Sequence, residues 1–232
     1  MSFAALPERL AQVRAEIARR QSAGGWTHPV TIVAVTKGFG SDAVTAAHAA
    51  GLVDIGENRV QEAVQKQEDL GAGSQGIRWH LIGHLQRNKA KLVPGRFALV
   101  QSVDSLELAT ELHKRASDRL RVLLQVNVAR EPQKSGCAPE DAPGLVRQIA
   151  GLGQLQLEGL MTIAPMTDDE DVQRRTFRSL RALRDTIKEE GVWLPTLSMG
   201  MSADYATAVA EGATVIRLGT VLFGPREKET TP

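Results

Sequence analysis

Lys37 stands where a lysine needs a chemical explanation, at the end of the β-forming run Val30–Lys37. Valine, isoleucine and threonine supply six of the eight residues of this run, so we predict a buried strand. A lysine is rarely buried without a partner. Lys37 therefore either extends its stem along apolar surface with its ammonium in water, or is a partly desolvated nucleophile that forms a Schiff base with a carbonyl compound.

Two short segments late in the chain have the residue types of an anion site. Ser202 follows Gly200 and precedes a predicted helix, so its hydroxyl and the first helical N–H groups are expected to face an anion. Gly219 and Thr220 would let a second stretch of backbone approach the same anion, because glycine has no side chain to block it. Each has a simpler interpretation, Ser202 as a helix cap and Gly219 as a turn, but their joint occurrence favours phosphate.

Other chemically active residue types are less persuasive. His80 and His84 have the i, i+4 spacing of a helical metal pair, but they lie in a predicted strand, where four residues span roughly 13 Å. We therefore predict no metal site. Cys137 has no histidine near it in sequence, and we do not expect a catalytic thiol. Neither a Walker loop nor a Gly-x-Ser-x-Gly elbow occurs.

Apolar periodicity and turn residues divide the chain into alternating strands and helices. An amphipathic N-terminal helix is predicted over residues 2–21, within a segment 1–25 that we expect to pack on the main fold. Strands are predicted at residues 30–37, 52–55, 78–83, 97–100, 121–128, 156–162, 196–198 and 214–218. Helices are predicted at residues 43–50, 60–70, 86–92, 104–116, 141–150, 168–190 and 203–211.

Eight strands, of which the first seven are each followed by a helix, predict an α/β fold with a parallel sheet closed into a single (β/α)8 TIM barrel over residues 1–232. An open doubly wound sheet is the alternative, but its dinucleotide fingerprint is absent. In such a barrel the chemistry lies at the carboxyl ends of the strands, and phosphate is commonly held after strands seven and eight. Lys37 and Ser202 are then expected on the same rim.

An imine-forming lysine and a phosphate site on one rim imply a ligand that carries both an aldehyde and a phosphate. Pyridoxal 5′-phosphate is the obvious ligand of this kind. A sugar-phosphate aldolase, in which the substrate supplies the carbonyl group, is the alternative within the same chemistry. A barrel-shaped scaffold without a ligand is a third interpretation.

Composition and charge exclude several classes of partner. The chain has 28 Lys and Arg against 27 Asp and Glu, a net charge of +1, which gives no electrostatic reason to expect nucleic acid or a membrane. We interpret the arginines at 174, 175, 178, 181 and 184 as a solvated helix face. One cysteine fits a reducing compartment, and the absence of a signal peptide or a long apolar run predicts a cytoplasmic protein, expected to be a monomer.

Seven sequence blocks, found in order along nearly the whole chain, carry a resemblance to a known family. The blocks are Ala34–Lys37, Gly56–Glu62, His80–Lys89, Lys134–Gly136, Glu158–Thr162, Leu197–Asp204 and Arg217–Gly224. Together they resemble the pyridoxal phosphate homeostasis protein family. That family is similar to the barrel domain of bacterial alanine racemase and of fold-III decarboxylases, without their second β domain.

The resemblance implies a role for each candidate residue. It implies that Lys37 carries the internal aldimine of pyridoxal phosphate and that Arg217 faces the pyridine nitrogen. The phosphate is implied to lie on Ser202, Gly219 and Thr220, and the pocket to be lined by Asn58 and Met199. The family is understood to bind and buffer the cofactor and to pass it to apoenzymes, without established turnover.

The alternative within this family resemblance is an amino-acid racemase or another fold-III enzyme of weak activity. A racemase needs bases on both faces of the reacting carbon. Lys37 could serve one face, but the second base is usually a tyrosine from another domain, and the sequence ends at Pro232 without one. Its single tyrosine, Tyr205, is expected to pack in a helix. We therefore expect a cofactor carrier rather than an enzyme.

Overall fold

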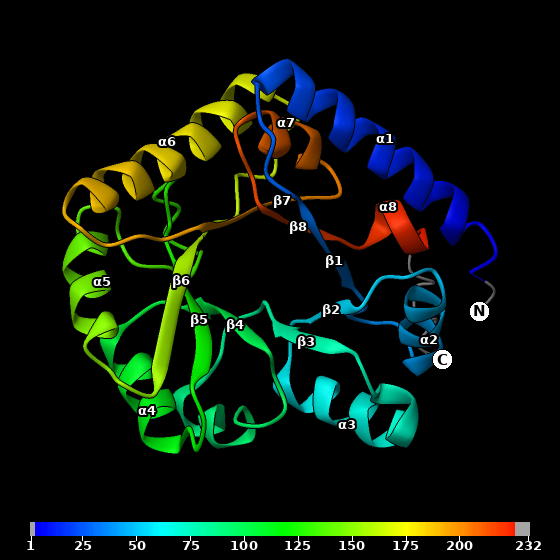
Figure 1. Cartoon of the computed structure of the whole chain (residues 1–232), viewed down its shortest axis with the longest axis horizontal. Coiled ribbons are helices and arrows are strands. Elements are labelled where there is room, and N and C mark those ends of the chain that lie inside the picture. Colours follow the sequence, from blue (N-terminus) through cyan, green and yellow to red (C-terminus); the bar gives the residue numbers. More distant parts are fainter. Residues whose placement is uncertain (1–2, 226–232) are drawn as a thin grey trace.

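The computed structural model describes residues 3–225 and shows eight strands enclosed by helices (Figure 1). The strands are β1 (Thr31–Val35), β2 (Asp54–Glu57), β3 (Arg78–Leu81), β4 (Leu99–Val103), β5 (Leu120–Gln125), β6 (Leu155–Met161), β7 (Thr196–Met201) and β8 (Val215–Leu218). The α-helices are α1 (Leu6–Gly24), α2 (Ser41–Ala49), α3 (Val60–Leu70), α4 (Leu106–Arg115), α5 (Ala142–Ala150), α6 (Glu170–Glu189), α7 (Tyr205–Ala210) and α8 (Thr220–Phe223). Two 3-10 helices, η1 (Gly71–Ser74) and η2 (Arg87–Leu92), flank β3.

The strands form a closed parallel barrel in the order β1 to β8, which confirms the predicted fold class. Closure is made by β1 and β8, which pair in parallel from Thr31 opposite Val215 to Ala34 opposite Leu218. All eight carboxyl ends therefore open on one rim of the barrel.

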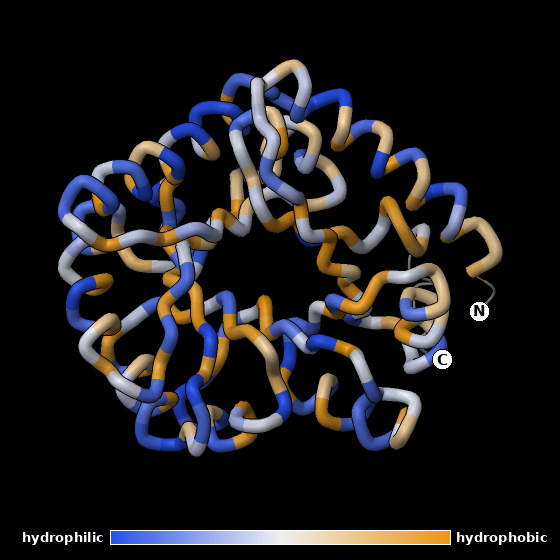
Figure 2. The backbone as a smooth tube through the Cα atoms, in the orientation of Figure 1, coloured by the Kyte–Doolittle hydropathy of each residue, from blue (hydrophilic) through white to orange (hydrophobic). Residues whose placement is uncertain are grey.

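Strand residues alternate between two apolar environments, one on each side of the barrel wall. Residues such as Ile55, Leu81 and Ile216 join helix residues such as Leu112 in a large cluster between strands and helices. A much smaller cluster, Leu99, Leu123 and Met161, is formed by residues of β4, β5 and β6 alone. Figure 2 shows hydrophobic residues along the strands, whereas hydrophilic residues recur along the outer helices α1 and α6.

Helix α1 lies outside the barrel beside α7 and α8 (Figure 1) and buries four apolar residues at helical spacing. Those residues are Leu6, Leu10, Val13 and Ile17. Beyond its end, the Trp26 Nε1–H donates to the Ala210 carbonyl at 2.8 Å, which fixes the return of the chain into β1. None of the helices within residues 3–225 is both long and apolar enough to cross a bilayer.

Several predicted boundaries shift in the structure. The segment predicted as helix 86–92 is the 3-10 helix η2, and β8 is followed by the short helix α8, which the sequence pattern did not indicate. The helix predicted from residue 104 begins at Leu106, and its N-cap is Ser105, whose hydroxyl accepts from the Leu108 N–H. These differences involve single turns, where local hydrogen bonds decide the outcome.

The arginine-rich face of α6 is less solvated than predicted. The side chains of Arg174, Arg178 and Arg181 all donate to the nearly buried carboxylate of Glu211, at 3.0 to 3.1 Å for the closest approach of each. Burial would raise the pKa of Glu211, but its hydrogen bonds and charge contacts with these arginines outweigh burial and lower it. Sequence spacing alone could not show this, because Glu211 comes 30 to 37 residues after these arginines, beyond β7 in the chain.

Gly83, just after β3, packs closely against the backbone of Asn58, just after β2. A Cβ atom at this position would come within 2.4 Å of the carbonyl oxygen of Asn58. Glycine is therefore needed here for close packing of two loops at the barrel rim.

We expect Gly83→Ala to lower the free energy of unfolding by about 1–3 kcal/mol, because the methyl group must displace the Asn58 backbone. Urea denaturation would measure the change. Gly153→Ala is the matched control, since a Cβ there meets no atom within 4 Å and should alter stability by less than about 0.5 kcal/mol. Equal stability of the two variants would contradict the close approach.

Candidate functional site

A cavity of about 510 Å³ opens at the carboxyl ends of the strands. It brings together six of the seven residues that the sequence analysis assigned to the site, namely Lys37, Asn58, Ser202, Arg217, Gly219 and Thr220. Lys37 lies two residues beyond β1, and Gly219 directly follows β8. An amine from the start of the chain and polar groups from its end therefore line one cavity.

Met199 is the exception, because it was expected to line the pocket and does not line the cavity. It is fully buried in the large cluster between strands and helices, whereas Met201 lines the cavity. The register of β7 against β8 shifts between Ser198 and Met201. Gly200 has a φ of 96° in this stretch, so the regular alternation of side chains breaks and Met201 faces the rim. A simple count along the strand could not anticipate this irregularity.

The expected anion-binding segments contact each other directly. The Ser202 hydroxyl oxygen accepts hydrogen bonds from the N–H groups of Gly219 and Val221, at 3.1 and 3.3 Å. Ser202 therefore does not cap the helix that follows it in sequence, which was the simpler interpretation, but contacts the first turn of α8. The N-cap of α7 is Asp204, whose carboxylate accepts from the Met201 N–H.

The backbone on both sides of Lys37 is held by acidic and basic side chains that sequence reasoning missed. The Lys66 ammonium, on α3, donates to the carbonyl of Thr36 at 2.8 Å. On the other side of Lys37, the Gly38 N–H donates to the carboxylate of Glu62 at 2.9 Å. The buried position of Lys66 could have been predicted from its spacing, because with Val60 and Ala63 it lies on the buried face of α3.

Glu57, at the end of β2, connects this network to the barrel wall. One carboxylate oxygen accepts from the Lys66 ammonium at 2.6 Å and also from the Thr36 hydroxyl. The other oxygen is buried and has no hydrogen-bond partner within residues 3–225. Burial raises the pKa of Glu57, although the charge of Lys66 opposes the shift. The network thus ties Thr36 to α3 through a buried ion pair.

Arg217 places a fixed cation in the wall of the cavity. Its side chain is only 3% exposed, and its two terminal nitrogens donate to the Ser198 hydroxyl at 2.7 Å and the Thr162 carbonyl at 2.8 Å. Burial lowers the pKa of Arg217 to about 10, with Asp204 opposing the shift. The guanidinium therefore keeps its charge at neutral pH.

The weaker candidates of the sequence analysis lie apart from one another. His80 is buried beside Asp54 and Gln101, whereas His84 lies at the cavity rim near Asp104. Among residues 3–225, no group of three or more His, Cys, Asp or Glu side chains is placed to hold a metal ion. Burial raises the pKa of the Cys137 thiol to about 12, so this thiol stays protonated at neutral pH.

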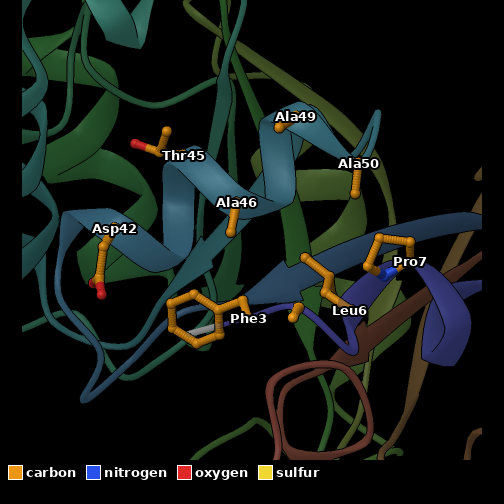
Figure 3. Close-up of a pocket in the computed structure, with 9 residues that line it drawn as sticks. Phe3, Leu6, Pro7, Asp42, Thr45, Ala46, Ala49 and Ala50 are labelled. Carbon is orange, nitrogen blue, oxygen red and sulfur yellow. The ribbon is translucent and has the colours of Figure 1, made fainter. Parts of the chain in front are cut away.

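A second cavity, of about 590 Å³, lies between the start of α1 and helix α2 (Figure 3). Its lining is mainly apolar, with Phe3, Leu6 and Ala46 among the residues drawn in the close-up. Asp42 is the ionisable residue among those that line it. A carboxylate would repel an anionic ligand, so this second cavity is poorly suited to a phosphate group.

Comparisons with known proteins agree with this geometry. The family model described as "Alanine racemase, N-terminal domain" matches residues 9–227. A solved alanine racemase of Clostridium difficile in complex with cycloserine superposes with a TM-score of 0.74 at 15% identity, covering 93% of this chain and 61% of that chain. The fold and the rim cavity therefore define a barrel of the alanine racemase N-terminal-domain class.

Relatives of higher sequence identity identify the family within this class. The chain is 43% identical to the pyridoxal phosphate homeostasis protein of Pseudomonas aeruginosa, over 96% of both chains, and 39% identical to that of Aquifex aeolicus, over 95% of this chain and 98% of the relative. The structure of PipY from Synechococcus elongatus PCC7942 with pyridoxal phosphate bound has 37% identity and a TM-score of 0.83, covering 94% of this chain and 100% of that chain. The chain belongs to the pyridoxal phosphate homeostasis protein family.

We expect Lys66→Met to lower the free energy of unfolding by about 3–5 kcal/mol, because it leaves the Glu57 carboxylate buried without its cation. The double variant Glu57→Gln/Lys66→Met should recover part of this loss in urea denaturation. Arg115→Met is the matched control, since it breaks the more exposed ion pair with Glu111 and should have little effect. Strictly additive effects of the two buried substitutions would show that the pair is not coupled.

Proposed function

We propose that this protein binds pyridoxal 5′-phosphate in the rim cavity and carries it for supply to apoenzymes. The observation that supports this most directly is the shared cavity of the Lys37 amine and the Ser202–Gly219 contact. The cofactor supplies an aldehyde that condenses with a primary amine, and Lys37 is placed at the wall to provide that amine. Its homologue PipY is described with the same cofactor bound.

The donor set at the end of the chain fits a phosphate group. Ser202 offers its hydroxyl hydrogen, because its oxygen already accepts from the N–H groups of Gly219 and Val221. A Cβ at Gly219 would meet protein atoms only at 3.5 Å or beyond, which is ordinary contact. The protein itself thus does not require glycine here, which fits a role in leaving room for a ligand. Thr220 lines the same region and adds a second hydroxyl.

The presence of Arg217 in the cavity wall supports a cofactor carrier rather than an enzyme that removes a proton from carbon. A guanidinium only donates hydrogen bonds, so beside the pyridine nitrogen it would favour the unprotonated ring. An unprotonated ring withdraws electrons less effectively from the carbon attached to the amine nitrogen, and this weakens catalysis of racemisation. Tyr205, the chain's single tyrosine, begins α7 and packs against the core rather than lining the cavity, so it is not placed as a second base.

The remaining lining suggests how the cofactor could leave. Met166 lines the cavity and is fully exposed, and Lys37 is half-buried rather than enclosed. Exchange with water and with a recipient enzyme would then need no large opening of the barrel. We infer release to a pyridoxal phosphate-requiring apoenzyme as the functional step, with the protein acting as a monomer.

We expect a new visible absorption band when pyridoxal 5′-phosphate is added to the purified protein. Reduction with borohydride should remove the band and add the cofactor's mass to the peptide that contains Lys37. The matched control is Lys134→Met, because Lys134 is the other lysine that lines the cavity, and its loss should leave the label on Lys37. The absence of a band, or a label confined to other peptides, would contradict the proposal.

We also expect the loaded protein, freed of unbound cofactor by gel filtration, to reactivate a pyridoxal phosphate-requiring apoenzyme. The same preparation should convert L- to D-alanine no faster than an equal concentration of free cofactor. Protein that has been reduced with borohydride is the control, since its cofactor cannot leave. Racemisation well above the free-cofactor rate would favour the enzyme interpretation, and failure to reactivate would contradict the carrier role.

A further inference from the structure

A row of five buried polar side chains crosses the interior of the barrel from its base to the rim cavity. In order they are Asp54, His80, Gln101, Ser198 and Arg217, each no more than 6% exposed. They come from β2, β3, β4, β7 and β8, so the row spans from one side of the barrel to the other. Most barrel interiors of this class are filled by branched apolar residues, so this polar row needs an explanation.

Each neighbouring pair in the row is joined by a hydrogen bond. The His80 Nε2 atom lies 2.9 Å from an Asp54 carboxylate oxygen, and the His80 Nδ1 atom lies 2.9 Å from the Gln101 amide nitrogen. The Gln101 carbonyl oxygen accepts from the Ser198 hydroxyl at 2.6 Å. Ser198 in turn accepts from Arg217 at 2.7 Å.

The two ends of the row fix the direction of every hydrogen bond between them. Arg217 has only donors, so Ser198 must accept from it and pass its own hydrogen to Gln101. At the other end, burial would raise the pKa of Asp54, but hydrogen bonds from His80 and Arg78 outweigh it and lower the pKa to about 2. Asp54 is therefore an ionised acceptor, and His80 must donate to it from Nε2. The His80 Nδ1 atom is left to accept from Gln101.

Reversal of the Gln101 amide would break this order. The Gln101 carbonyl oxygen would then face the His80 Nδ1 atom. This Nδ1 atom would have to carry a hydrogen, because otherwise two acceptors would be in contact. His80 would have to be a cation in order to keep its bond to Asp54 as well. Ser198 would receive two donors, one from Gln101 and one from Arg217. The arrangement in the structure is thus the one that satisfies every member of the row with a neutral His80.

We propose that His80, Gln101 and Ser198 are positioning residues that hold the Arg217 guanidinium in the orientation it presents to the ring nitrogen of the bound cofactor. This inference rests on the proposed binding of pyridoxal 5′-phosphate at the rim cavity. Arg217 is held at two points, by Ser198 on the neighbouring strand β7 and by the carbonyl of Thr162, the residue that follows β6. Because the Ser198 hydrogen is taken by Gln101, the serine oxygen stays available to Arg217.

The test compares Gln101→Leu with the matched control Thr176→Val. Thr176 is also buried and its side chain also makes a hydrogen bond, but it lies on α6 and does not line the cavity. With ¹⁵N-labelled pyridoxal 5′-phosphate, we expect an unprotonated ring-nitrogen signal in the unmodified protein. In Gln101→Leu that signal should move toward the pyridinium value, and the dissociation constant should rise about fivefold, as for loss of one hydrogen bond. Borohydride should still label Lys37 in both variants.

Unchanged ring-nitrogen signals and dissociation constants in Gln101→Leu would overturn the inference. Ser198→Ala provides a second variant if Gln101→Leu does not fold, and the same shift is expected from it.

A measurement on the ligand-free protein separates this inference from the proposed function. ¹⁵N NMR should show His80 in the neutral form with its hydrogen on Nε2, and the Arg217 side-chain signals should change in Gln101→Leu but not in Thr176→Val. A hydrogen on His80 Nδ1, or Arg217 signals insensitive to Gln101, would overturn the positioning role. Absence of labelling at Lys37 in the unmodified protein would instead contradict cofactor binding. In that case the ligand-free signals would still test whether His80, Gln101 and Ser198 position Arg217.

Discussion

The pairing of β1 with β8 is the constraint on which the rest of the structure depends. Ala34 lies opposite Leu218 in this parallel pair, and the chain continues from these residues to Lys37 and Gly219 at the rim. Residues separated by about 180 positions in sequence therefore line a single cavity. A slip of one residue in this register would turn alternate side chains to the opposite face of the barrel wall. Lys37 and the Ser202–Gly219 contact would then no longer line one cavity.

The barrel tolerates an unusual number of buried charges because each has an assigned partner. Lys66 and Glu57 pair outside the barrel wall, and Glu211 is held by arginines of α6. Inside the barrel, Arg217 is compensated by oxygen acceptors and lies near Asp204. Such groups contribute little net stability compared with apolar packing, but removal of one partner is costly. The paired buried charges therefore favour the arrangement of the rim in which each charge keeps its partner.

Most of the architecture could be predicted from the sequence because β-forming runs and helical periodicity alternate regularly along the chain. Lys37, Ser202 and Gly219 could be singled out because a closed parallel barrel places all strand ends on one rim. The missing details involve contacts that no local pattern encodes. Met199 was assigned to the pocket by the resemblance alone, whereas the alternation that points Ser198 into the barrel turns Met199 outward. The irregular backbone at Gly200 brings Met201 to the cavity instead.

The polar row from Asp54 to Arg217 escaped the sequence analysis for a related reason. Its members are single polar residues on separate strands, and each appears ordinary within its own segment. Only closure of the barrel brings Gln101 of β4 within hydrogen-bonding distance of Ser198 of β7. The partnership of Ser202 with α8 was likewise hidden, because α8 is a single short turn.

The contact between Ser202 and the first turn of α8 has a thermodynamic consequence. Because the Ser202 oxygen already accepts from two backbone N–H groups, the two late segments are locked together before any ligand arrives. Binding of an anion would then cost little conformational entropy, because these two loops are already ordered. The serine hydrogen, polarised by the two bonds its oxygen accepts, would be a stronger donor to an anion bound there. In the proposed carrier role, capture and departure of the cofactor would then need no folding of these two segments.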